Sequence, residues 1–326
     1  MIVTLTLNPS LDRTIEIARL TRGAMTRATG TRLDPGGKGV NVSRALAAHA
    51  LPTRAVVPLG GPEGSQLTTL LELEGIDVCA VPVSGHTRSN VSLVEPDGTV
   101  TKVNEPGGSL RPVDLERIVS ATLAAADGAD GADWVVASGS LPPGVPDTFY
   151  ARLGARLAES GIRFAVDTSG PALAAALGCG PALVKPNRDE LAESVGFRID
   201  TVGDAVRAAE AMRASGAEAV LASLGGDGAV LVDRHGARYG ESPVDHGRSA
   251  VGAGDAMLAG YLAGGVTAGD ALVEALSWGA AAVRLPGSRM PGPSDVERGA
   301  VLVHATADLS RPLSGPHHEH GMEQIR

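Results

Sequence analysis

Segments with the pattern of strands alternate with helix-like segments along most of this 326-residue chain, and this alternation restricts the fold most. Apolar and β-branched runs predict buried strands at 2–7, 54–58, 134–137, 163–167, 182–184 and 219–223, followed by a hairpin at 229–239. Helices are predicted at 40–50, 65–74, 113–126, 147–160, 172–176, 188–195, 202–215, 256–264, 268–284 and 294–305. This order predicts an α/β fold whose mostly parallel sheet carries helices on both faces and binds ligands at the carboxyl ends of its strands.

Four further strand-like segments are too polar for the interior of such a sheet. They lie at 14–17 and 26–33, and in a hairpin of 89–95 with 99–104 around Pro96-Asp97-Gly98. We expect them to form a small second sheet, a lid contributed by residues of about 12–34 and 87–106. The length suits one domain, 1–309. The polar segment 310–326, which contains His317, His318 and His320, is predicted to be a disordered tail rather than a metal site.

The composition restricts the kind of ligand. A net charge of −9 argues against a nucleic-acid partner, because phosphate backbones require a basic face. An anionic ligand would therefore have to be held by a few local cations. Cys79 and Cys179 are expected to be buried free thiols, consistent with a reducing cytoplasm. We find neither a signal peptide nor a run of roughly 20 apolar residues, so we expect a cytoplasmic protein without a membrane partner.

A glycine turn followed by a helical run combines an anion site with a carboxylate: Ser249-Ala250-Val251-Gly252-Ala253-Gly254-Asp255-Ala256. Glycines leave the first N–H groups of the helix uncovered, and these groups attract an anion together with the helix dipole. Asp255 at the helix start is placed to take a proton from a hydroxyl. The combination suggests phosphoryl transfer to an alcohol. A plain turn with Asp255 as the N-cap is the structural alternative.

A second glycine cluster also leads into a helix: Pro35-Gly36-Gly37-Lys38-Gly39-Val40-Asn41. It is not a Walker A loop, because Gly39 stands after Lys38 where that motif requires Ser or Thr. What it provides is a backbone that can close tightly on a ligand, with Lys38 and Asn41 facing it.

The two glycine regions, PGGKGVNVSRAL at 35–46 and VGAGDAMLAG at 251–260, resemble the signatures of the ribokinase-like (PfkB) carbohydrate kinases. TLNPSLD at 6–12, SGSLPPG at 138–144 and KPNRDEL at 185–191 resemble its 1-phosphofructokinase and tagatose-6-phosphate kinase branch. The resemblance runs from about residue 2 to about residue 305, with the five motifs in the family's order. It implies a ribokinase-like three-layer α/β/α fold with a β lid, and ATP and Mg²⁺ as co-substrate and cofactor.

The resemblance also implies roles for individual residues. Asp255 would be the catalytic base, and the N–H groups of Gly252, Ala253 and Gly254 would meet the charge on the transferred phosphoryl group. Asn187 and Glu190 match the family's magnesium-organising element, which acts mostly through waters; an ordinary first helical turn is the alternative. The expected ATP-binding residues are Lys185, Asn187, Ser223, Gly225, Gly226, Gly228 and Ser249.

The substrate side is argued from charge. Arg88 matches the branch's phosphate-binding position, and Arg suits bidentate phosphate binding. Asp12 would accept hydrogen bonds from sugar hydroxyls. The other expected substrate contacts are Gly37, Lys38, Asn41, Lys102, Ser138 and Gly139. For Lys102, a solvated strand lysine is nearly as good an interpretation.

We therefore expect ATP-dependent phosphorylation of a ketohexose phosphate, with fructose 1-phosphate as the favoured substrate. Tagatose 6-phosphate, fructose 6-phosphate and a non-catalytic sugar-phosphate sensor stay open. Arg284 and Pro286 stand where related kinases usually carry small residues along the adenine pocket. Nucleotide preference and a monovalent-cation site near Ser249 and Val251 stay open for that reason. The open edges and apolar face of the lid predict a homodimer through the lid strands.

Overall fold

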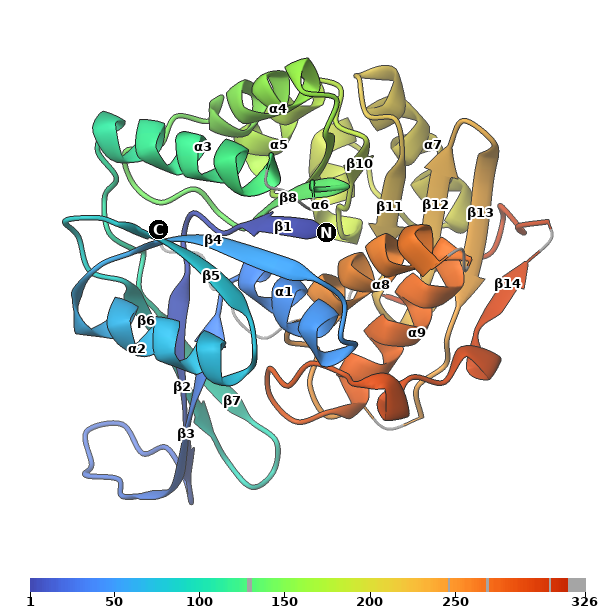
Figure 1. Cartoon of the computed structure of the whole chain (residues 1–326). Coiled ribbons are helices and arrows are strands. Elements are labelled where there is room, and N and C mark those ends of the chain that lie inside the picture. Colours follow the sequence, from blue (N-terminus) through green and yellow to red (C-terminus); the bar gives the residue numbers. More distant parts are fainter. Residues whose placement is uncertain (128–130, 246, 268–269, 305, 316–326) are drawn as a thin grey trace.

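A broad twisted sheet forms the centre of the molecule (Figure 1). The computed structural model describes residues 1–127, 131–245, 247–267, 270–304 and 306–315. Within these residues the sheet has ten strands in the order β14-β13-β12-β11-β10-β9-β8-β1-β4-β5. The strands from β11 to β5 are parallel, and β12, β13 and β14 extend the sheet in antiparallel pairs. Their bounds are β1 Ile2–Leu5, β4 Thr53–Leu59, β5 Asp77–Pro82, β8 Trp134–Ser138, β9 Arg163–Asp167, β10 Leu183–Val184, β11 Val220–Ser223, β12 Ala229–Asp233, β13 Gly236–Glu241 and β14 Leu302–His304.

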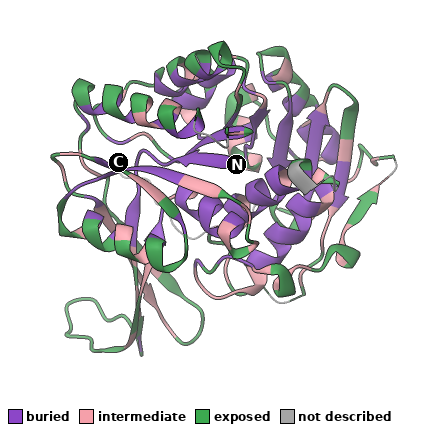
Figure 2. Ribbon diagram, in the orientation of Figure 1, coloured by how far each residue is buried: buried purple, intermediate pink, exposed green. Residues whose placement is uncertain are grey.

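Helices cover both faces of this sheet, as the sequence predicts. Successive strand residues point to opposite faces, so Val3 and Leu5 pack with one group of helices and Ile2 with the other. The first group is α3 Pro112–Ala126, α4 Phe149–Glu159, α5 Gly170–Leu177, α6 Arg188–Val195 and α7 Val202–Ala214. The second is α1 Lys38–Ala48, α2 Gly61–Leu73, α8 Ala253–Thr267 and α9 Ala271–Arg284. Figure 2 shows the buried sheet between helices whose outer faces are exposed.

The predicted lid is present as a separate four-stranded sheet. Its order is β3-β2-β6-β7, and it projects below the body in Figure 1. The bounds are β2 Ser10–Ile17, β3 Ala28–Gly36, β6 Arg88–Val94 and β7 Val100–Asn104. Because β2 pairs with β6 in parallel, Asp12 lies beside Asn90 at the base of the lid, next to the body.

Two predictions of secondary structure are wrong. The strand β5 was missed because it is an edge strand with mostly half-exposed or exposed residues, so its sequence lacks an alternating pattern. The helix predicted at 294–305 is replaced by two short 3₁₀ turns, Pro293–Asp295 and Arg298–Ala300, and by β14. Glycine at 292 and 299 disfavours a helix, and β13 offers a free edge with which β14 pairs. Residue 305 lies outside the described residues.

The start of the predicted tail is ordered, which corrects the boundary at 309. Leu313 is only 8% exposed and belongs to the main hydrophobic core. Thr201 and Pro312 form an antiparallel β-bridge. The remainder of the predicted tail, 316–326 with its three histidines, lies outside the described residues, as do positions 268–269 at the predicted start of the helix that is observed as α9.

Other expectations from composition can be compared directly. Cys79 and Cys179 are free thiols, though each is half-buried rather than buried, and burial raises the pKa of both. No helix in the described part of the chain is long and apolar enough to cross a membrane.

Candidate active site

Polar side chains gather where neighbouring parallel strands end. Ser138 ends β8 and pairs in register with Asp167, which ends β9. Lys185 comes directly after β10, and its N–H donates to the carbonyl of Val166 over 3.0 Å. Thr6 follows β1 in the same way. The carboxyl edge of the sheet therefore carries a row of polar groups, as a fold of this kind requires for a ligand site.

Asp255 is buried beside this row. It lies in the first turn of α8 and is 7% exposed. Asn41 in α1 donates from Nδ2 to Oδ2 of Asp255 over 2.8 Å. Burial and, secondarily, the charge of Asp167 raise the pKa of Asp255 from 3.8 to about 6, although Asn41 and two lysines act in the opposite direction. A carboxylate with this pKa is ionised at neutral pH and basic enough to accept a proton, which suits a general base.

The glycine turn before α8 keeps two of the three predicted N–H donors unbonded in the described residues. The N–H of Ala253 donates to the carbonyl of Ala250 over 3.2 Å, so it is not free in this structure. In the described residues no acceptor is bonded to the N–H groups of Gly252, Gly254 and Asp255. A Cβ on Gly254 would lie 3.2 Å from Nζ of Lys185. The absence of a side chain therefore lets a lysine approach the helix start, where its charge adds to the attraction for an anion.

Asp167 forms ion pairs with two of the lysines that are expected to bind ligands, Lys38 and Lys185. This role of Asp167 was not predicted from the sequence. Its Oδ1 lies 2.8 Å from Nζ of Lys38, and its Oδ2 lies 3.1 Å from Nζ of Lys185. Burial alone would raise the pKa of Asp167, but the two lysines hold it below its usual value. Glu190 is 3.6 Å from Lys38 through Oε1. The sequence signal was an acid at the last position of a predicted strand, a place that faces the ligand edge of a parallel sheet.

A cavity of about 270 Å³ connects the lid to this row of polar groups. Among the predicted residues, Lys38, Arg88, Gly139 and Glu190 line it. Residues that were not predicted complete the lining: Thr6, Asn8, Ser140, Thr168 and Ser169. Three of them, Thr6, Asn8 and Ser140, belong to motifs quoted for the resemblance. Their signal in the sequence is a polar residue close to the carboxyl end of a predicted strand.

The base of the lid orients the predicted sugar-binding side chains. Asp12 accepts hydrogen bonds through Oδ1 from Ser10 Oγ over 2.7 Å and from Asn90 Nδ2 over 2.8 Å. Arg88 donates from Nε to the carbonyl of Asn8 and from Nη1 to the carbonyl of Glu105, both over 3.2 Å. These bonds leave the Nη2 end of the guanidinium for a ligand in the cavity.

Lys102 lies farther out than the other substrate residues. It pairs with Ser92 in β6, two residues beyond Asn90 along that strand. It shares the lid face of Asp12 and Asn90 because residues two apart in a strand point the same way. Its side chain is exposed and does not line the cavity.

Asn187 and Glu190 form a capping box at the start of α6. Asn187 Oδ1 accepts the N–H of Glu190 over 2.8 Å, and Glu190 Oε2 accepts the N–H of Asn187 over 2.9 Å. The alternative interpretation, an ordinary first helical turn, is therefore realised as well. The capping box uses Oε2 of Glu190, so Oε1 stays directed toward Lys38 and the cavity. Among the described residues no group of three or more His, Cys, Asp or Glu is arranged to hold a metal ion. One outward carboxylate oxygen fits Mg²⁺ held mainly through water, because Mg²⁺ takes few direct protein ligands.

Six of the predicted ATP-binding residues lie at or just after the ends of the neighbouring strands β10 and β11, whereas Ser249 does not. Ser223 forms a parallel bridge with Asn187, and its N–H donates to the carbonyl of Pro186 over 3.0 Å. The segment 223–229, which we call the nucleotide loop, continues as a 3₁₀ turn at Gly225–Asp227. Gly228 has φ +92° and lies against the carbonyl of Gly240, so a side chain there would collide with backbone. The contacts of Ser223 with Pro186 and Asn187 place the start of this loop next to Lys185.

Arg284, which was not expected along the adenine pocket, is the last residue of α9. Ser249 donates its N–H to the carbonyl of Val283 over 3.2 Å, which places it beside the last turn of α9. Arg284 forms an ion pair of 3.3 Å with Glu297. A partner outside the nucleotide loop therefore engages this guanidinium.

The segment 287–290 joins the lid to the glycine turn. The guanidinium of Arg32 in β3 lies directly against Gly287, where a Cβ would collide with it. Ser288 accepts a hydrogen bond of 3.0 Å from Arg44, a buried residue of α1. The methyl group of Met290 lies 2.5 Å from the position of a Cβ on Gly252.

Comparison with known proteins agrees with this arrangement. Residues 5–285 match the model of the pfkB family carbohydrate kinases. The chain belongs to this family. The carbohydrate kinase is 40% identical over 264 residues to a 1-phosphofructokinase of Rhodobacter capsulatus, covering 80% of this chain and 82% of that one. It is 37% identical over 260 residues to the ATP-dependent 6-phosphofructokinase isozyme 2 of Escherichia coli, covering 79% and 83%.

Solved structures confirm the ribokinase-like fold of this kinase. The crystal structure of phosphofructokinase-2 from Escherichia coli in complex with potassium matches with a TM-score of 0.84 and 34% identity, over 90% of this chain and 96% of that one. The family resemblance, the α/β class and the kinase assignment predicted from the sequence are therefore confirmed.

Proposed function

We propose that this kinase transfers the γ-phosphoryl group of ATP to fructose 1-phosphate, giving fructose 1,6-bisphosphate. The observation that carries the proposal is a polar cavity lined by Lys38 and Arg88, together with the buried base Asp255, whose carboxylate interacts with the charge of Lys38. The cavity lies at the carboxyl edge of the sheet, where the nucleotide loop also ends. A sugar phosphate with its anionic end at Arg88 would direct its other end toward Lys38 and Asp255.

Each step of the transfer has a residue suited to it. The attacking sugar hydroxyl gives its proton to Asp255 as the new bond between its oxygen and the γ-phosphorus forms. The bond from that phosphorus to the bridging oxygen breaks, and ADP leaves with the electron pair. The N–H groups of Gly252 and Gly254, with Lys185 beside them, stabilise the negative charge on the transferred group. Glu190 would hold Mg²⁺ through water, and the ion would supply positive charge to the phosphates.

The similarity to two kinds of phosphofructokinase leaves related substrates in competition. Relatives named 1-phosphofructokinase and 6-phosphofructokinase isozyme 2 are of nearly equal identity, 40% and 37%. Fructose 6-phosphate and tagatose 6-phosphate are therefore the alternative substrates. Asp255 argues against a non-catalytic sugar-phosphate sensor. Burial raises the pKa of this aspartate and so disfavours its charged form, and a protein that only binds a sugar phosphate would gain nothing from that.

A coupled assay of the purified kinase with ATP and Mg²⁺ tests the proposal. Fructose 1-phosphate, fructose 6-phosphate and tagatose 6-phosphate are compared by kcat/KM, with Asp255→Asn as the inactive control. We expect fructose 1-phosphate to give the highest value. A higher value for either 6-phosphate would move the assignment to that substrate, and no turnover with any of them would support the sensor.

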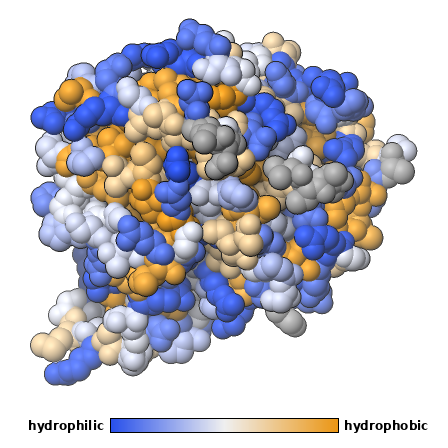
Figure 3. All heavy atoms as spheres, viewed as in Figure 1, coloured by the Kyte–Doolittle hydropathy of each residue, from blue (hydrophilic) through white to orange (hydrophobic). Residues whose placement is uncertain are grey.

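We also infer a cytoplasmic homodimer that forms through the lid strands. The lid is a small sheet with two free edges, β3 and β7, in the described residues. Val91, Leu93 and Val103 lie on one face of it, and Val103 is 59% exposed. In Figure 3 the projecting lid carries a mixture of hydrophilic and hydrophobic surface. A second lid packed against the first would cover both the edges and this apolar face.

Monovalent-cation binding near Ser249 and Val251 is the remaining proposal for this site. Its support is the potassium-bound structure of the Escherichia coli phosphofructokinase-2, which shares the fold over 90% of this chain. Activity compared in potassium chloride and in choline chloride at equal ionic strength tests it. Equal rates in the two salts would argue against a cation site.

A further inference from the structure

The segment 309–314, which we call the C-terminal strap, is bonded to the start of α7, to β13, to the nucleotide loop and to Arg188. The N–H groups of Val202 and Gly203 donate to the carbonyls of Arg311 and Leu309, over 3.0 and 2.9 Å. A Cβ on Gly203 would lie 2.6 Å from the carbonyl oxygen of Leu309, so the close approach depends on this glycine. With Leu313 buried in the core, the strap is an integral part of the fold.

An ion pair fixes the strap to strand β13. Both terminal nitrogens of Arg311 contact the carboxylate of Glu241, over 3.0 and 2.7 Å. The Arg311 guanidinium also lies 5.4 Å from the ring centre of Tyr239. The hydroxyl of Tyr239 donates to the carbonyl of Asp227 over 2.8 Å. The backbone of the nucleotide loop is thus held by the same strand that anchors the strap.

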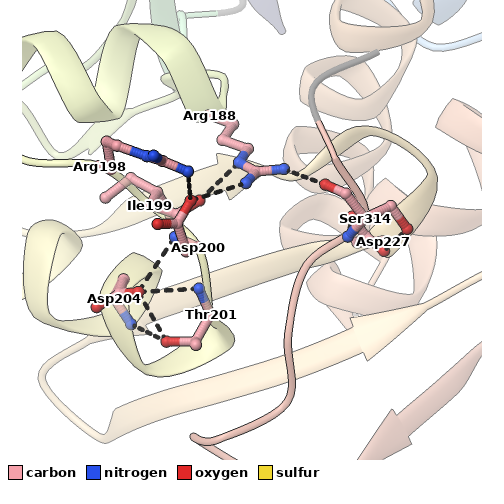
Figure 4. Close-up of polar contacts among 8 residues, drawn as sticks. All are labelled: Arg188, Arg198, Ile199, Asp200, Thr201, Asp204, Asp227 and Ser314. Carbon is pink, nitrogen blue, oxygen red and sulfur yellow. Dashed lines mark hydrogen bonds and ion pairs between the residues drawn. The ribbon is translucent and has the colours of Figure 1, made fainter.

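Ser314 at the end of the strap holds the side chain of that aspartate. Its N–H donates to Oδ2 of Asp227 over 2.9 Å, and its Oγ donates to Oδ1 over 2.8 Å. Its carbonyl accepts a hydrogen bond of 2.6 Å from Nη1 of Arg188. Figure 4 shows the Arg188 guanidinium between Ser314 and Asp200. One serine therefore bridges the nucleotide loop and the residue that follows Asn187.

These two contacts converge on the elements expected to bind ATP. Asp227 is the only residue other than glycine in the 3₁₀ turn Gly225–Asp227, so it is the side chain through which that turn can be fixed. Neighbouring glycines give the turn little conformational restraint of its own. Ordering such a loop at the moment of binding would cost affinity, and a contact that orders it beforehand removes that cost.

We propose that the C-terminal strap presets the nucleotide loop, with Ser314 as a positioning residue for ATP. The proposal rests on the assignment of 223–229 to ATP binding. In the described residues the strap neither lines the cavity nor hydrogen-bonds to the lid strands, so we expect its effect to fall on ATP and not on the sugar phosphate. Ser314 acts through Asp227 and Arg188 and need not touch the nucleotide.

The test compares KM for ATP with KM for the sugar phosphate in point variants of the full-length kinase. Ser314→Ala removes the Oγ bond and should raise KM for ATP about three- to tenfold, the usual worth of one such hydrogen bond. kcat and KM for the sugar phosphate should stay close to wild type. Ser314→Thr keeps the hydroxyl and should restore KM for ATP. Ser310→Ala is the matched control, because that serine bonds only within the strap region, to Asp308.

A double-mutant cycle and two truncations complete the experiment. Asp227→Ala combined with Ser314→Ala should cost no more than Asp227→Ala alone, since the two residues act as a pair. Removal of residues 310–326 should raise KM for ATP more than Ser314→Ala does, whereas removal of 316–326 should leave it unchanged. If the longer truncation does not fold, the point variants decide the question by themselves.

Two results would overturn the proposal. One is an unchanged KM for ATP in Ser314→Ala; the other is an equal rise in both KM values, which would indicate general destabilisation. Failure of the proposed function is distinguishable, because the wild-type kinase would then turn over none of the sugar phosphates. ATP binding followed by isothermal titration calorimetry, in wild type and Ser314→Ala, tests the strap in that event too.

Discussion

Asn41 donates a hydrogen bond of 2.8 Å to Oδ2 of Asp255, although 214 residues separate them in the chain. The other end of the Asn41 amide accepts a hydrogen bond of 3.4 Å from Nη1 of Arg44, and this contact fixes which way the amide points. The amide nitrogen is therefore directed at one carboxylate oxygen of Asp255. The other oxygen stays available for a substrate hydroxyl.

Replacement of the base should abolish turnover and leave ligand binding intact. Asp255→Asn keeps the shape of the side chain and its contact with Asn41 but cannot accept the proton. General-base catalysis contributes roughly 10²- to 10⁴-fold, so kcat should fall by that factor while both KM values stay near wild type. Steady-state kinetics measures this. A variant with more than about a tenth of wild-type kcat, below the low end of that range, would mean that Asp255 is not the base.

The same substitution should stabilise the ligand-free kinase at alkaline pH. The folded-state pKa of Asp255 is about 6, above its unfolded value of 3.8, so the wild type loses stability as pH rises through this window. Asn carries no charge to bury. At pH 8 the variant should be more stable by on the order of 1 to 3 kcal/mol, and the gain should vanish near pH 4. Urea unfolding at both pH values checks this; an equal difference at both would contradict it.

The pH dependence of kcat/KM should show an acid limb near pH 6. Protonation of Asp255 below its pKa of about 6 removes the base. A sugar phosphate also titrates near pH 6, so a single profile does not separate the two groups. Asp167→Asn separates them, because the charge of Asp167 raises the pKa of Asp255 and its loss should move the limb to lower pH. A limb that stays in place would belong to the substrate.

Loss of the guanidinium at the lid should weaken sugar-phosphate binding selectively. Arg88→Ala removes a charged donor from the cavity wall, and hydrogen bonds to charged groups contribute about 1.5–3 kcal/mol. KM for the sugar phosphate should rise about 10- to 100-fold, with KM for ATP nearly unchanged. Arg19→Ala is the control, because Arg19 is exposed after the end of β2 and does not line the cavity. Equal KM values in Arg88→Ala and wild type would remove Arg88 from the site.

The dimer should depend on the apolar face of the lid. Light scattering at assay concentration, with the sugar phosphate present, should give about twice the chain mass of 32.9 kDa. Val103→Asp places a charge on the exposed apolar position and should shift the mass to that of a single chain. A wild-type mass near 33 kDa would exclude the dimer.

The central residues of the candidate site could be proposed from motifs because each motif is local in sequence. Asp255 follows its glycine turn directly, and Asn187 and Glu190 lie one helical turn apart, so short-range patterns were enough to propose them, and their roles stay predictions. Asp167 was missed because nothing adjacent marks it. Its role arises only when β10, which leads to Lys185, lies beside β9 and the start of α1 brings Lys38 to the same edge, and neither contact is local in sequence.

Misjudged segments share a physical cause. The segment 310–326 has a polar composition that predicted disorder, yet its residues 310–314 are ordered by an ion pair and hydrogen bonds with residues far away in the chain. The strand β14 likewise exists because β13 offers an edge, and not because of its own three residues. Contacts of this kind leave no periodic pattern in the sequence.

The segment 287–290 is short, and both of its ends are occupied. Arg32 of the lid lies directly on the backbone at Gly287, and Met290 fills the space beside Gly252. The Arg32 side chain, whose guanidinium also pairs with Asp34, would therefore be the first part of the lid to report a movement relative to the glycine turn. A substitution within these four residues should be felt both at the lid and at the turn that leads to Asp255, so we expect the two parts of the molecule to vary together in evolution.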